Sequence, residues 1–181
     1  MEKKIYLVSI GKNYEGVVEY LKENLKIVYP FEFVPKEIDL EIESAFNPIR
    51  RQYLSQLILL RLKKEKPEDA FMILGIFNKD LYTDNLNFIF GQAEPSSGIG
   101  IISIYRLREE FYNRMENKEL LRIRALKEAV HEIGHLFGLP HCLSPTCVMY
   151  FSNSIIDTDK KSFKLCISCE RKLKRVLKKL K

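Results

Sequence analysis

The chain has 181 residues, of which 46% are hydrophobic and 30% are charged. This length and composition predict one globular domain with a substantial core, and they exclude a disordered chain. No apolar run is long enough to cross a membrane, and the apolar run near the basic N-terminus is too short for a signal peptide. We therefore expect a cytoplasmic protein with no membrane partner.

The net charge of +6 is concentrated at the C-terminus. Residues 160–181 contain ten Lys or Arg side chains and one acid, Glu170, so this segment carries +9 and the rest of the chain −3. Apolar residues recur at helical spacing within the segment: Leu173, Val176, Leu177 and Leu180. We interpret the basic side as a solvated helix face, and contact with nucleic acid or another acidic partner is the alternative.

Strands and helices alternate along the first half of the chain. Apolar runs predict strands over residues 5–10, 28–34 and 71–76, of which the second contains proline and suits a sheet edge. Helical spacing predicts a helix over 17–25 and another from Asn47-Pro48 to about Lys64. This order predicts an α/β fold whose sheet contains parallel strands.

The next part of the chain is expected to complete the sheet. The polar segment 78–87, which contains Asp80 and Asp84, predicts a loop. Short strands are predicted over 88–90 and 99–105. Because no helix separates these two strands, we expect the sheet to have an antiparallel edge.

Two helices are predicted after the sheet. The first begins near Asn117, and Gly138 is placed to end it in the left-handed conformation. Its apolar stripe consists of Leu126, Val130, Ile133 and Phe137. The second helix follows Cys169 and carries the basic residues of the C-terminus.

The first of these helices leads into the sequence HEIGHLFGLPH, residues 131–141, which contains every histidine of the chain. His131 and His135 are four residues apart, so both imidazoles project from one helix face and can share one metal ion. Glu132 lies beside them and can take a proton from metal-bound water. Gly138 turns the chain back so that His141 can complete the ligand set. Three protein ligands leave a fourth position for water, as in a catalytic zinc site.

A chance match is the alternative for such a motif. The pattern HExxH alone occurs in unrelated helices, but each further fixed position reduces chance matches by about twentyfold, and here both Gly138 and His141 are correctly placed. Gly134 costs about 1 kcal/mol relative to alanine inside a helix, which suggests that a neighbour needs the space.

All four cysteines follow the histidines: Cys142, Cys147, Cys166 and Cys169. They form C-x4-C and C-x2-C pairs separated by eighteen residues, a spacing that resembles a closed four-cysteine zinc site. In a reducing compartment, zinc binding is favoured over disulfides or buried free thiols. Lys164, Arg171 and Lys172 flank the second pair and could offset the charge of four thiolates.

The sequence resembles a known family of zinc proteases. HExxHxxGxxH followed by Met149 is the metzincin signature, in which a methionine lies beneath the metal. A cysteine directly after the third histidine, with CVM and CISC downstream, is similar to the archaemetzincin family. Further similar stretches are RRQYLSQ, DLY at 80–82, NFIFGQA at 87–93, ISIYRLREEFY at 102–112 and RALKEAVHE at 124–132.

This resemblance implies a metzincin-like catalytic domain spanning residues 1–181. It would comprise a mixed, twisted sheet with an antiparallel edge strand, a backing helix and an active-site helix. Residues 1–138 would form the upper subdomain. Residues 139–181 would form a small lower subdomain stapled by zinc and ending in the basic helix.

The resemblance also implies two zinc ions per chain. The catalytic ion would be held by His131, His135 and His141, with Glu132 as general base. The structural ion would be held by Cys142, Cys147, Cys166 and Cys169. Several metzincins have a tyrosine two residues after the Met-turn methionine, but here Phe151 occupies that position. We assign Tyr150 no catalytic function and expect it to be a packed aromatic.

The sequence therefore predicts a metalloprotease that acts on peptides or proteins. By resemblance, an extended substrate would pair with the edge strand near Asn87–Gln92, for which a plain sheet edge is the alternative. We expect a monomer of narrow or peptide-sized specificity that does not bind nucleic acid. The competing hypothesis is a zinc-stabilised binding module that uses its basic helix, and a hydrolase of a non-peptide amide is a third. Glu132 separates the first two, because a binding module needs no general base.

Overall fold

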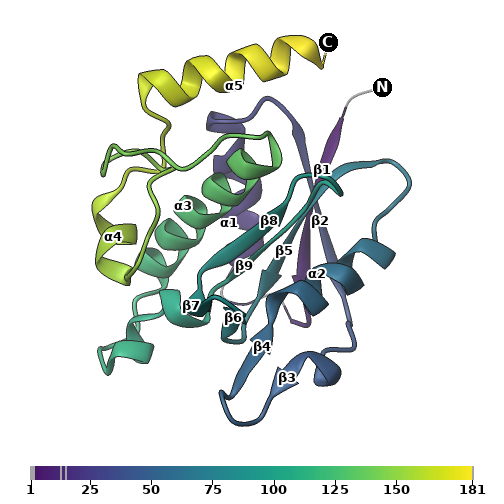
Figure 1. Cartoon of the computed structure of the whole chain (residues 1–181), viewed down its shortest axis with the longest axis vertical. Coiled ribbons are helices and arrows are strands. Elements are labelled where there is room, and N and C mark those ends of the chain that lie inside the picture. Colours follow the sequence, from purple (N-terminus) through teal and green to yellow (C-terminus); the bar gives the residue numbers. More distant parts are fainter. Residues whose placement is uncertain (1–2, 13, 15, 181) are drawn as a thin grey trace.

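The computed structural model describes residues 3–12, 14 and 16–180, and within them a five-stranded mixed sheet forms the centre of the molecule (Figure 1). The strand order is β2-β1-β5-β9-β8, with β1 (Lys4–Ile10), β2 (Glu32–Ile38), β5 (Ala70–Phe77), β8 (Gly91–Glu94) and β9 (Ile99–Ser103). Four strands are parallel, and β8 pairs antiparallel with β9 at one edge. The predicted mixed sheet with an antiparallel edge strand is confirmed.

Helices cover both faces of this sheet: α1 (Val17–Asn24), α2 (Ser55–Lys64) and α3 (Lys118–Leu136). One hydrophobic core joins α1 and α3 to the sheet face that carries Leu74, and a second joins α2 to the face that carries Ile73. Successive residues of a strand point to opposite faces, so the apolar run of β5 fills both cores. The predicted α/β fold is therefore confirmed.

A second, four-stranded sheet was not predicted. Its order is β3-β4-β6-β7, with β3 (Phe46–Asn47), β4 (Gln52–Leu54), β6 (Leu81–Thr83) and β7 (Leu86–Ile89). The expected loop over 78–87 thus contains β6 and the start of β7. Asp80 anchors this region because Arg106 donates to both of its carboxylate oxygens at 2.7 Å. The predicted strand over 88–90 likewise belongs largely to β7, and β8 forms the sheet edge instead.

The expected helix start at Asn47-Pro48 was wrong. The Asn47 side chain does accept hydrogen bonds from the backbone N–H groups of Ile49 and Arg50, as an N-cap would. However, Arg51 has a φ of 55°, which ends the turn and returns the chain into β4. The α2 helix begins only at Ser55. The strand predicted over 28–34 also begins later, at Glu32, although β2 is an edge strand as expected.

The long helix α3 begins and ends as the sequence predicts. The Asn117 side chain caps its N-terminus by accepting from the Leu120 N–H, and Gly138 follows its C-terminus with a φ of 79°. Its stripe of Leu126, Val130, Ile133 and Phe137 is buried. The helix therefore presents residues 131–135 from a rigid base.

Buried charged residues tie α3 to the short helix α4 (Ile155–Lys160), which was not predicted. Arg124 is 1% exposed, and its guanidinium donates to both carboxylate oxygens of Asp159 at 2.7 Å. One turn later, the Lys127 ammonium donates to the backbone carbonyls of Thr158 and Asp159. These contacts fix the segment that follows residue 150 against the active-site helix.

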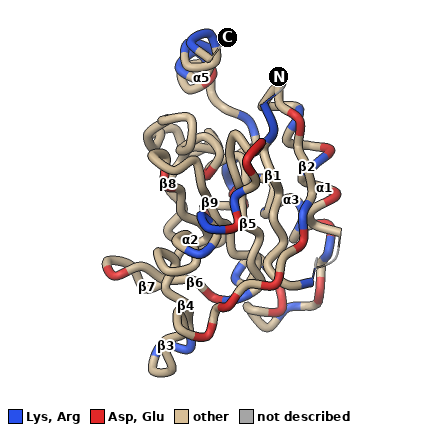
Figure 2. Tube along the Cα trace, turned by 90° about the vertical axis from the view of Figure 1, so that its right-hand side faces the viewer, with Lys and Arg blue, Asp and Glu red and all other residues tan. Residues whose placement is uncertain are grey.

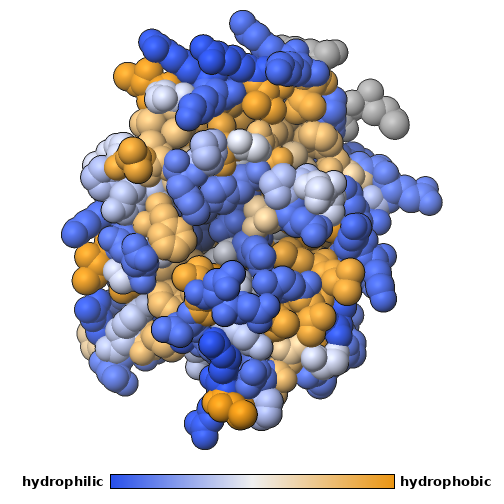
Figure 3. All heavy atoms as spheres, in the orientation of Figure 1, coloured by the Kyte–Doolittle hydropathy of each residue, from blue (hydrophilic) through white to orange (hydrophobic). Residues whose placement is uncertain are grey.

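The C-terminal helix α5 (Ile167–Lys179) packs by one face and exposes a basic one (Figure 2). It begins earlier than predicted, because Cys166 is its N-cap residue and Cys169 lies in its first turn. Leu173 is buried, whereas hydrophilic side chains cover the outside of the helix in the space-filling view (Figure 3). In the described part of the chain, no helix combines the length and apolar character that crossing a membrane requires.

Candidate metal centre and active-site cleft

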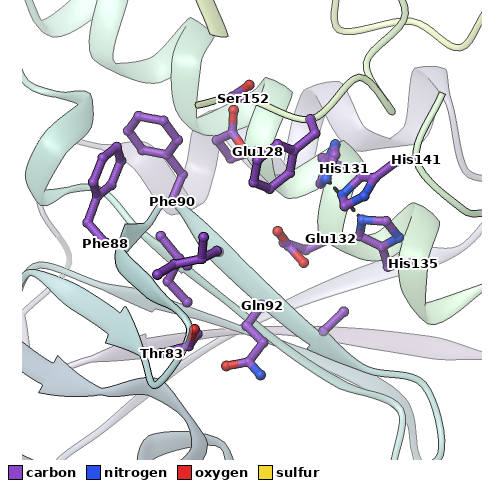
Figure 4. Close-up of a pocket in the computed structure, with 15 residues that line it drawn as sticks. Thr83, Phe88, Phe90, Gln92, Glu128, His131, Glu132, His135, His141 and Ser152 are labelled. Atoms are coloured by element: carbon purple, nitrogen blue, oxygen red, sulfur yellow. Dashed lines mark hydrogen bonds between the residues drawn. The ribbon is translucent and has the colours of Figure 1, made fainter. Parts of the chain in front are cut away.

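The three histidines converge at the C-terminal end of α3 (Figure 4). His131 and His135 lie one turn apart on the helix, and the turn at Gly138 brings His141 to face them. One ring nitrogen from each of the three lies within 4.8 Å of the others. The Nε2 atoms of His131 and His135 are 3.0 Å apart. The spacing argument from the sequence thus agrees with the observed geometry.

The hydrogen bonds of these rings indicate which nitrogen is free. His131 Nδ1 donates to the Val148 carbonyl at 2.8 Å, and His135 Nδ1 donates to the Leu139 carbonyl at 2.7 Å. A carbonyl can only accept, so each Nδ1 carries the proton and each Nε2 presents a lone pair. Two lone pairs at 3.0 Å repel each other unless a cation lies between them. The donor set therefore fits a zinc ion, whose histidine ligands are oriented in this manner.

Loss of hydration favours the neutral form of these rings, most strongly for buried His131. It lowers the pKa of His131 well below its ordinary value, and it lowers the pKa of His135 and His141 as well. Nearby Lys161 acts in the same direction on all three. A neutral imidazole is the form that binds metal, so the electrostatics of the site favour metal binding near neutral pH.

Glu132 points from the same helix into the cleft, beside the histidines (Figure 4). It is 4% exposed, and burial raises the pKa of its carboxyl well above the ordinary value, as does neighbouring Glu128. A raised pKa makes a carboxylate a better proton acceptor near neutral pH. Glycine at position 91 of β8 leaves room for it, because a Cβ there would lie 2.6 Å from Glu132 Oε1.

Replacing Gly91 by Ala should therefore displace the Glu132 carboxylate. We expect kcat to fall by about 10- to 100-fold with zinc content unchanged, since a shift of about 1 Å in a catalytic group can cost about 100-fold. Gly100→Ala on the adjacent strand is a matched control, because a Cβ there would be no closer than 3.4 Å to its neighbours. Equal kcat in the two variants would contradict this account of Gly91.

Met149 is fully buried and packs against Gly134, which lies between His131 and His135 on α3. A Cβ at Gly134 would approach the Met149 Sδ to 2.5 Å. The neighbour that needs glycine at this position is therefore Met149. Tyr150 is half-buried and forms an isolated β-bridge with Cys142. Phe151 instead lies beside the histidines, with its ring centroid 5.0 Å from that of His141.

Gly134→Ala should lower the free energy of unfolding by about 1–3 kcal/mol, the usual cost of overpacking, despite a gain of about 1 kcal/mol in helix propensity. Urea denaturation of the single variant would measure this cost. In Gly134→Ala/Met149→Ala the clash is absent, so the two effects should not add. Simple additivity would show that Met149 is not what requires glycine here.

The four cysteines form a second cluster directly beyond His141. Their sulfurs lie within 4.8 Å of one another, and no described cysteine is in a disulfide. Cys142 Sγ and Cys166 Sγ are 3.8 Å apart, which equals the edge of a tetrahedron of about 3.8 Å expected for Zn–S bonds of about 2.3 Å. The residue types and the spacing both fit a closed zinc site.

Backbone groups support thiolates in this cluster. The N–H of Ser144 donates to Cys142 Sγ, and that of Cys166 donates to Cys147 Sγ. The backbone N–H of Cys169 is the largest cause that lowers the pKa of Cys166 to about 7, whereas burial raises the pKa of Cys147 and Cys169. Hydrogen bonds from N–H groups stabilise the deprotonated form that a metal ligand requires.

A cleft of about 220 Å³ connects the histidines with β8 (Figure 4). The histidines and Glu132 line one side, and Phe88, Phe90, Glu128 and Ser152 line the other end. The small second sheet supplies one lip of the cleft through residues of β6 and β7, and the segment after Met149 supplies the opposite lip. The chain thus places a candidate metal, a carboxylate and an exposed strand edge around one cavity.

Comparison with known proteins agrees with this geometry. A model of peptidase family M54 matches residues 4–175. The chain is 44% identical over 183 residues to the archaemetzincin of Pyrococcus furiosus. The alignment covers 98% of this chain and 95% of that protein. It is 45% identical over 174 residues to the archaemetzincin of Methanocaldococcus jannaschii, with coverage of 96% and 94%. The chain belongs to peptidase family M54, the archaemetzincins.

Solved archaemetzincin structures have the same fold. The crystal structure of archaemetzincin from Methanopyrus kandleri has a TM-score of 0.87 and 34% identity, covering 98% of this chain and 96% of that one. A zinc-dependent peptidase from Methanocorpusculum labreanum has a TM-score of 0.84 and 32% identity, with coverage of 93% and 99%. This archaemetzincin is accordingly a zinc metallopeptidase.

Every site residue predicted from the archaemetzincin motif lies in one of the two clusters or in contact with them. Sequence reasoning missed Gly91 and Glu128 in the lining of the cleft, and it missed Lys161, which lies behind the cleft against Glu128. Lys161 Nζ lies 3.0 Å from Glu128 Oε1, and both side chains are buried. Glu128 is three residues before His131 and one helical turn before Glu132, so helical spacing alone could have placed it on the cleft face.

Proposed function

We propose that this archaemetzincin hydrolyses peptide bonds at a zinc ion held by His131, His135 and His141, with Glu132 as general base. The geometry of His131 and His135 carries this proposal. Their Nε2 atoms are 3.0 Å apart, and in each ring Nδ1 donates to a backbone carbonyl, so each Nε2 presents a lone pair. A zinc ion held there would act as a Lewis acid, polarising a carbonyl and lowering the pKa of bound water from about 15.7 to about 7.

The residues of the chain supply the rest of the chemistry. The Glu132 carboxylate accepts a proton from the attacking water and can return it to the leaving amine. Burial strengthens it as a base, and Gly91 lets the edge strand approach it closely. Phe88, Phe90 and Phe151 give the cleft an apolar, aromatic lining beside the reacting atoms.

We further propose that Cys142, Cys147, Cys166 and Cys169 hold a second, structural zinc. Four protein ligands leave no position for water, so this ion would stabilise the fold without taking part in hydrolysis. It would join the loop after His141 to the N-terminus of α5. In this description residues 1–138 and 139–181 are upper and lower subdomains of one catalytic domain.

The substrate is proposed to bind as an added strand. β8 is the last strand in its sheet, so its outer backbone N–H and C=O groups have no strand partner among the described residues. An extended peptide paired with that edge would carry a scissile carbonyl past the histidines and Glu132. The two lips narrow the cleft, which favours peptides over folded proteins. We retain the expectations of a monomer that acts in the cytoplasm.

The basic face of α5 supports the alternative of a binding module for nucleic acid or another acidic partner. A binding module would leave two features without a function: Glu132 and the three-histidine site with its open fourth ligand position. Binding that depends steeply on salt and survives removal of the histidine-bound metal would favour it.

Peptide-library hydrolysis, followed by mass spectrometry, tests the proposed function. We expect two zinc ions per chain, cleavage that is lost with a chelator, and recovery when zinc is restored. His135→Ala is the control, because it should retain only the zinc of the cysteine cluster and cleave nothing. Absence of cleavage across the library by the two-zinc protein would contradict the proposal.

A further inference from the structure

Two buried polar groups lie at the end of the cleft and have no function in hydrolysis as described. Glu128 is 3% exposed and lines the cleft. The Ser152 Oγ atom, which also belongs to a cleft residue, is buried and has no hydrogen-bond partner among the described residues. Both residues line the same cleft, and Figure 4 shows them at the end opposite Gln92.

An unpaired buried hydroxyl requires an explanation, because it costs about 1–3 kcal/mol. Glu128 is only partly satisfied as well. Thr158 Oγ1 donates to Glu128 Oε1, and Lys161 Nζ lies 3.0 Å from the same oxygen. Thr158 and Lys161 therefore both contact Oε1, which leaves the Glu128 Oε2 atom able to accept a further hydrogen bond. A ligand that reached this end of the cleft could satisfy both groups.

The charges select against an ionic ligand. Lys161 is fully buried and balances Glu128, so the pair is close to neutral. A cationic side chain would add an unbalanced positive charge beside Lys161 and the proposed zinc. An anionic side chain would meet the Glu128 carboxylate. Burying an uncompensated charge is far more costly than burying a neutral hydrogen-bonding group.

The path to these groups is apolar and aromatic. Phe88 and Phe90 form an edge-to-face pair with ring centroids 5.2 Å apart, and both line the cleft with Phe151. Aromatic side chains prefer offset or edge-on packing against such rings. The fitting side chain thus has a flat apolar body and a neutral hydrogen-bond donor at its tip.

We propose that this end of the cleft, formed by Phe88, Phe90, Glu128 and Ser152, is a subsite that selects tyrosine at a substrate position next to the scissile bond. The proposal rests on the proposed peptidase function. The tyrosine hydroxyl donates to Glu128 Oε2 and accepts from Ser152 Oγ, while its ring packs on the phenylalanines. Phenylalanine fills the same space but leaves both polar groups unpaired, which is the situation in which discrimination between two such residues is strong.

Binding to an inactive protein tests the subsite independently of turnover. The probes are blocked pentapeptides with a central Tyr, Phe, Leu, Lys or Glu and alanine elsewhere. Calorimetry with zinc-loaded Glu132→Gln protein should give a dissociation constant for the Tyr peptide at least about tenfold below that for Phe, and weaker binding still for Lys and Glu. Adding Ser152→Ala should reduce the Tyr–Phe difference to threefold or less. Adding Ser96→Ala, an exposed serine on the β8–β9 turn, should leave it unchanged.

The outcomes separate this inference from the proposed function. Cleavage by the wild-type chain without preference for Tyr over Phe, or a preference that survives Ser152→Ala, would overturn the tyrosine subsite alone. Failure of every pentapeptide to bind, together with no cleavage of any library peptide, would overturn both. Preferred cleavage next to tyrosine in the wild-type chain, lost in Ser152→Ala but kept in Ser96→Ala, would support both.

Discussion

Glu132→Gln is expected to lower kcat for peptide hydrolysis by about 10²- to 10⁴-fold, the usual contribution of a general base. Glutamine has the same shape, so it can occupy the space beside Gly91 and leave the helix and the histidines in place. It cannot accept a proton from water near neutral pH. The loss should therefore appear in the chemical step, with zinc content and peptide affinity close to those of the unchanged protein.

Three measurements on the same preparation distinguish this effect from damage to the fold. Zinc content by elemental analysis should remain at two per chain, and the unfolding midpoint should not fall, since a buried carboxylate has been removed. Steady-state kinetics should show the change in kcat. Glu116→Gln, an exposed carboxylate before α3, controls for the loss of one negative charge. An active Glu132→Gln enzyme would exclude Glu132 as the base.

Cys166→Ser is expected to affect both metal sites together. The cysteine cluster should lose its zinc or bind it far more weakly, because one of four thiolates is missing. We also expect the affinity of the histidine site to fall by about 10- to 100-fold, the range for residues that orient metal ligands. Two pairs of residues that are neighbours in the sequence explain this coupling. His141 precedes Cys142, and the Val148 carbonyl that orients His131 directly follows Cys147.

Zinc competition with a calibrated chelator, followed at each site, would measure both affinities. Ser168→Ala is the matched control, because it changes an exposed residue of the same first turn of α5. Protease digestion should cut α5 faster in Cys166→Ser, since the helix would lose its attachment at Cys166 and Cys169. Loss of one zinc with unchanged affinity at the other site would refute the coupling.

The sequence predicted which histidines and which cysteines lie together, because the spacing that brings them together is local. His131 and His135 are related by one helical turn, and His141 by a short turn at Gly138. The same holds for the close cysteine pairs. The central sheet was also predictable, because the apolar runs at residues 5–10 and 71–76 each form a buried strand. Local spacing was sufficient in these cases.

The second sheet could not be predicted from local patterns. Asn47-Pro48 resembles a helix start, and the asparagine makes the expected backbone bonds, but Arg51 then takes a left-handed conformation. The parallel pairing of Tyr53 in β4 with Leu81 in β6 holds this segment in a sheet. Likewise, the polar segment around Asp80 becomes ordered through Arg106, which lies 26 residues away. Contacts between distant residues override local preference here.

The cleft residues that were missed depend on such distant contacts. Gly91 matters because β8 passes over Glu132, which no spacing within residues 87–93 could reveal. Glu128 and Lys161 pair across 33 positions, from α3 to the end of α4. Their charges looked like those of solvated surface residues. Only the folded arrangement shows that both are buried and that Glu128 lines the end of the cleft.

The backbone joins the two proposed zinc sites directly, through the bonds His141–Cys142 and Cys147–Val148. This link affects how zinc is distributed among the molecules when zinc is scarce. If each occupied site improves the other by 10- to 100-fold, the coupling free energy is about 1.4–2.7 kcal/mol. If the two sites have similar intrinsic affinities, chains carrying two ions or none then outnumber those carrying one. A limited metal supply would divide the pool into complete enzymes and empty chains, so that activity per bound zinc stays nearly constant while the number of working molecules changes.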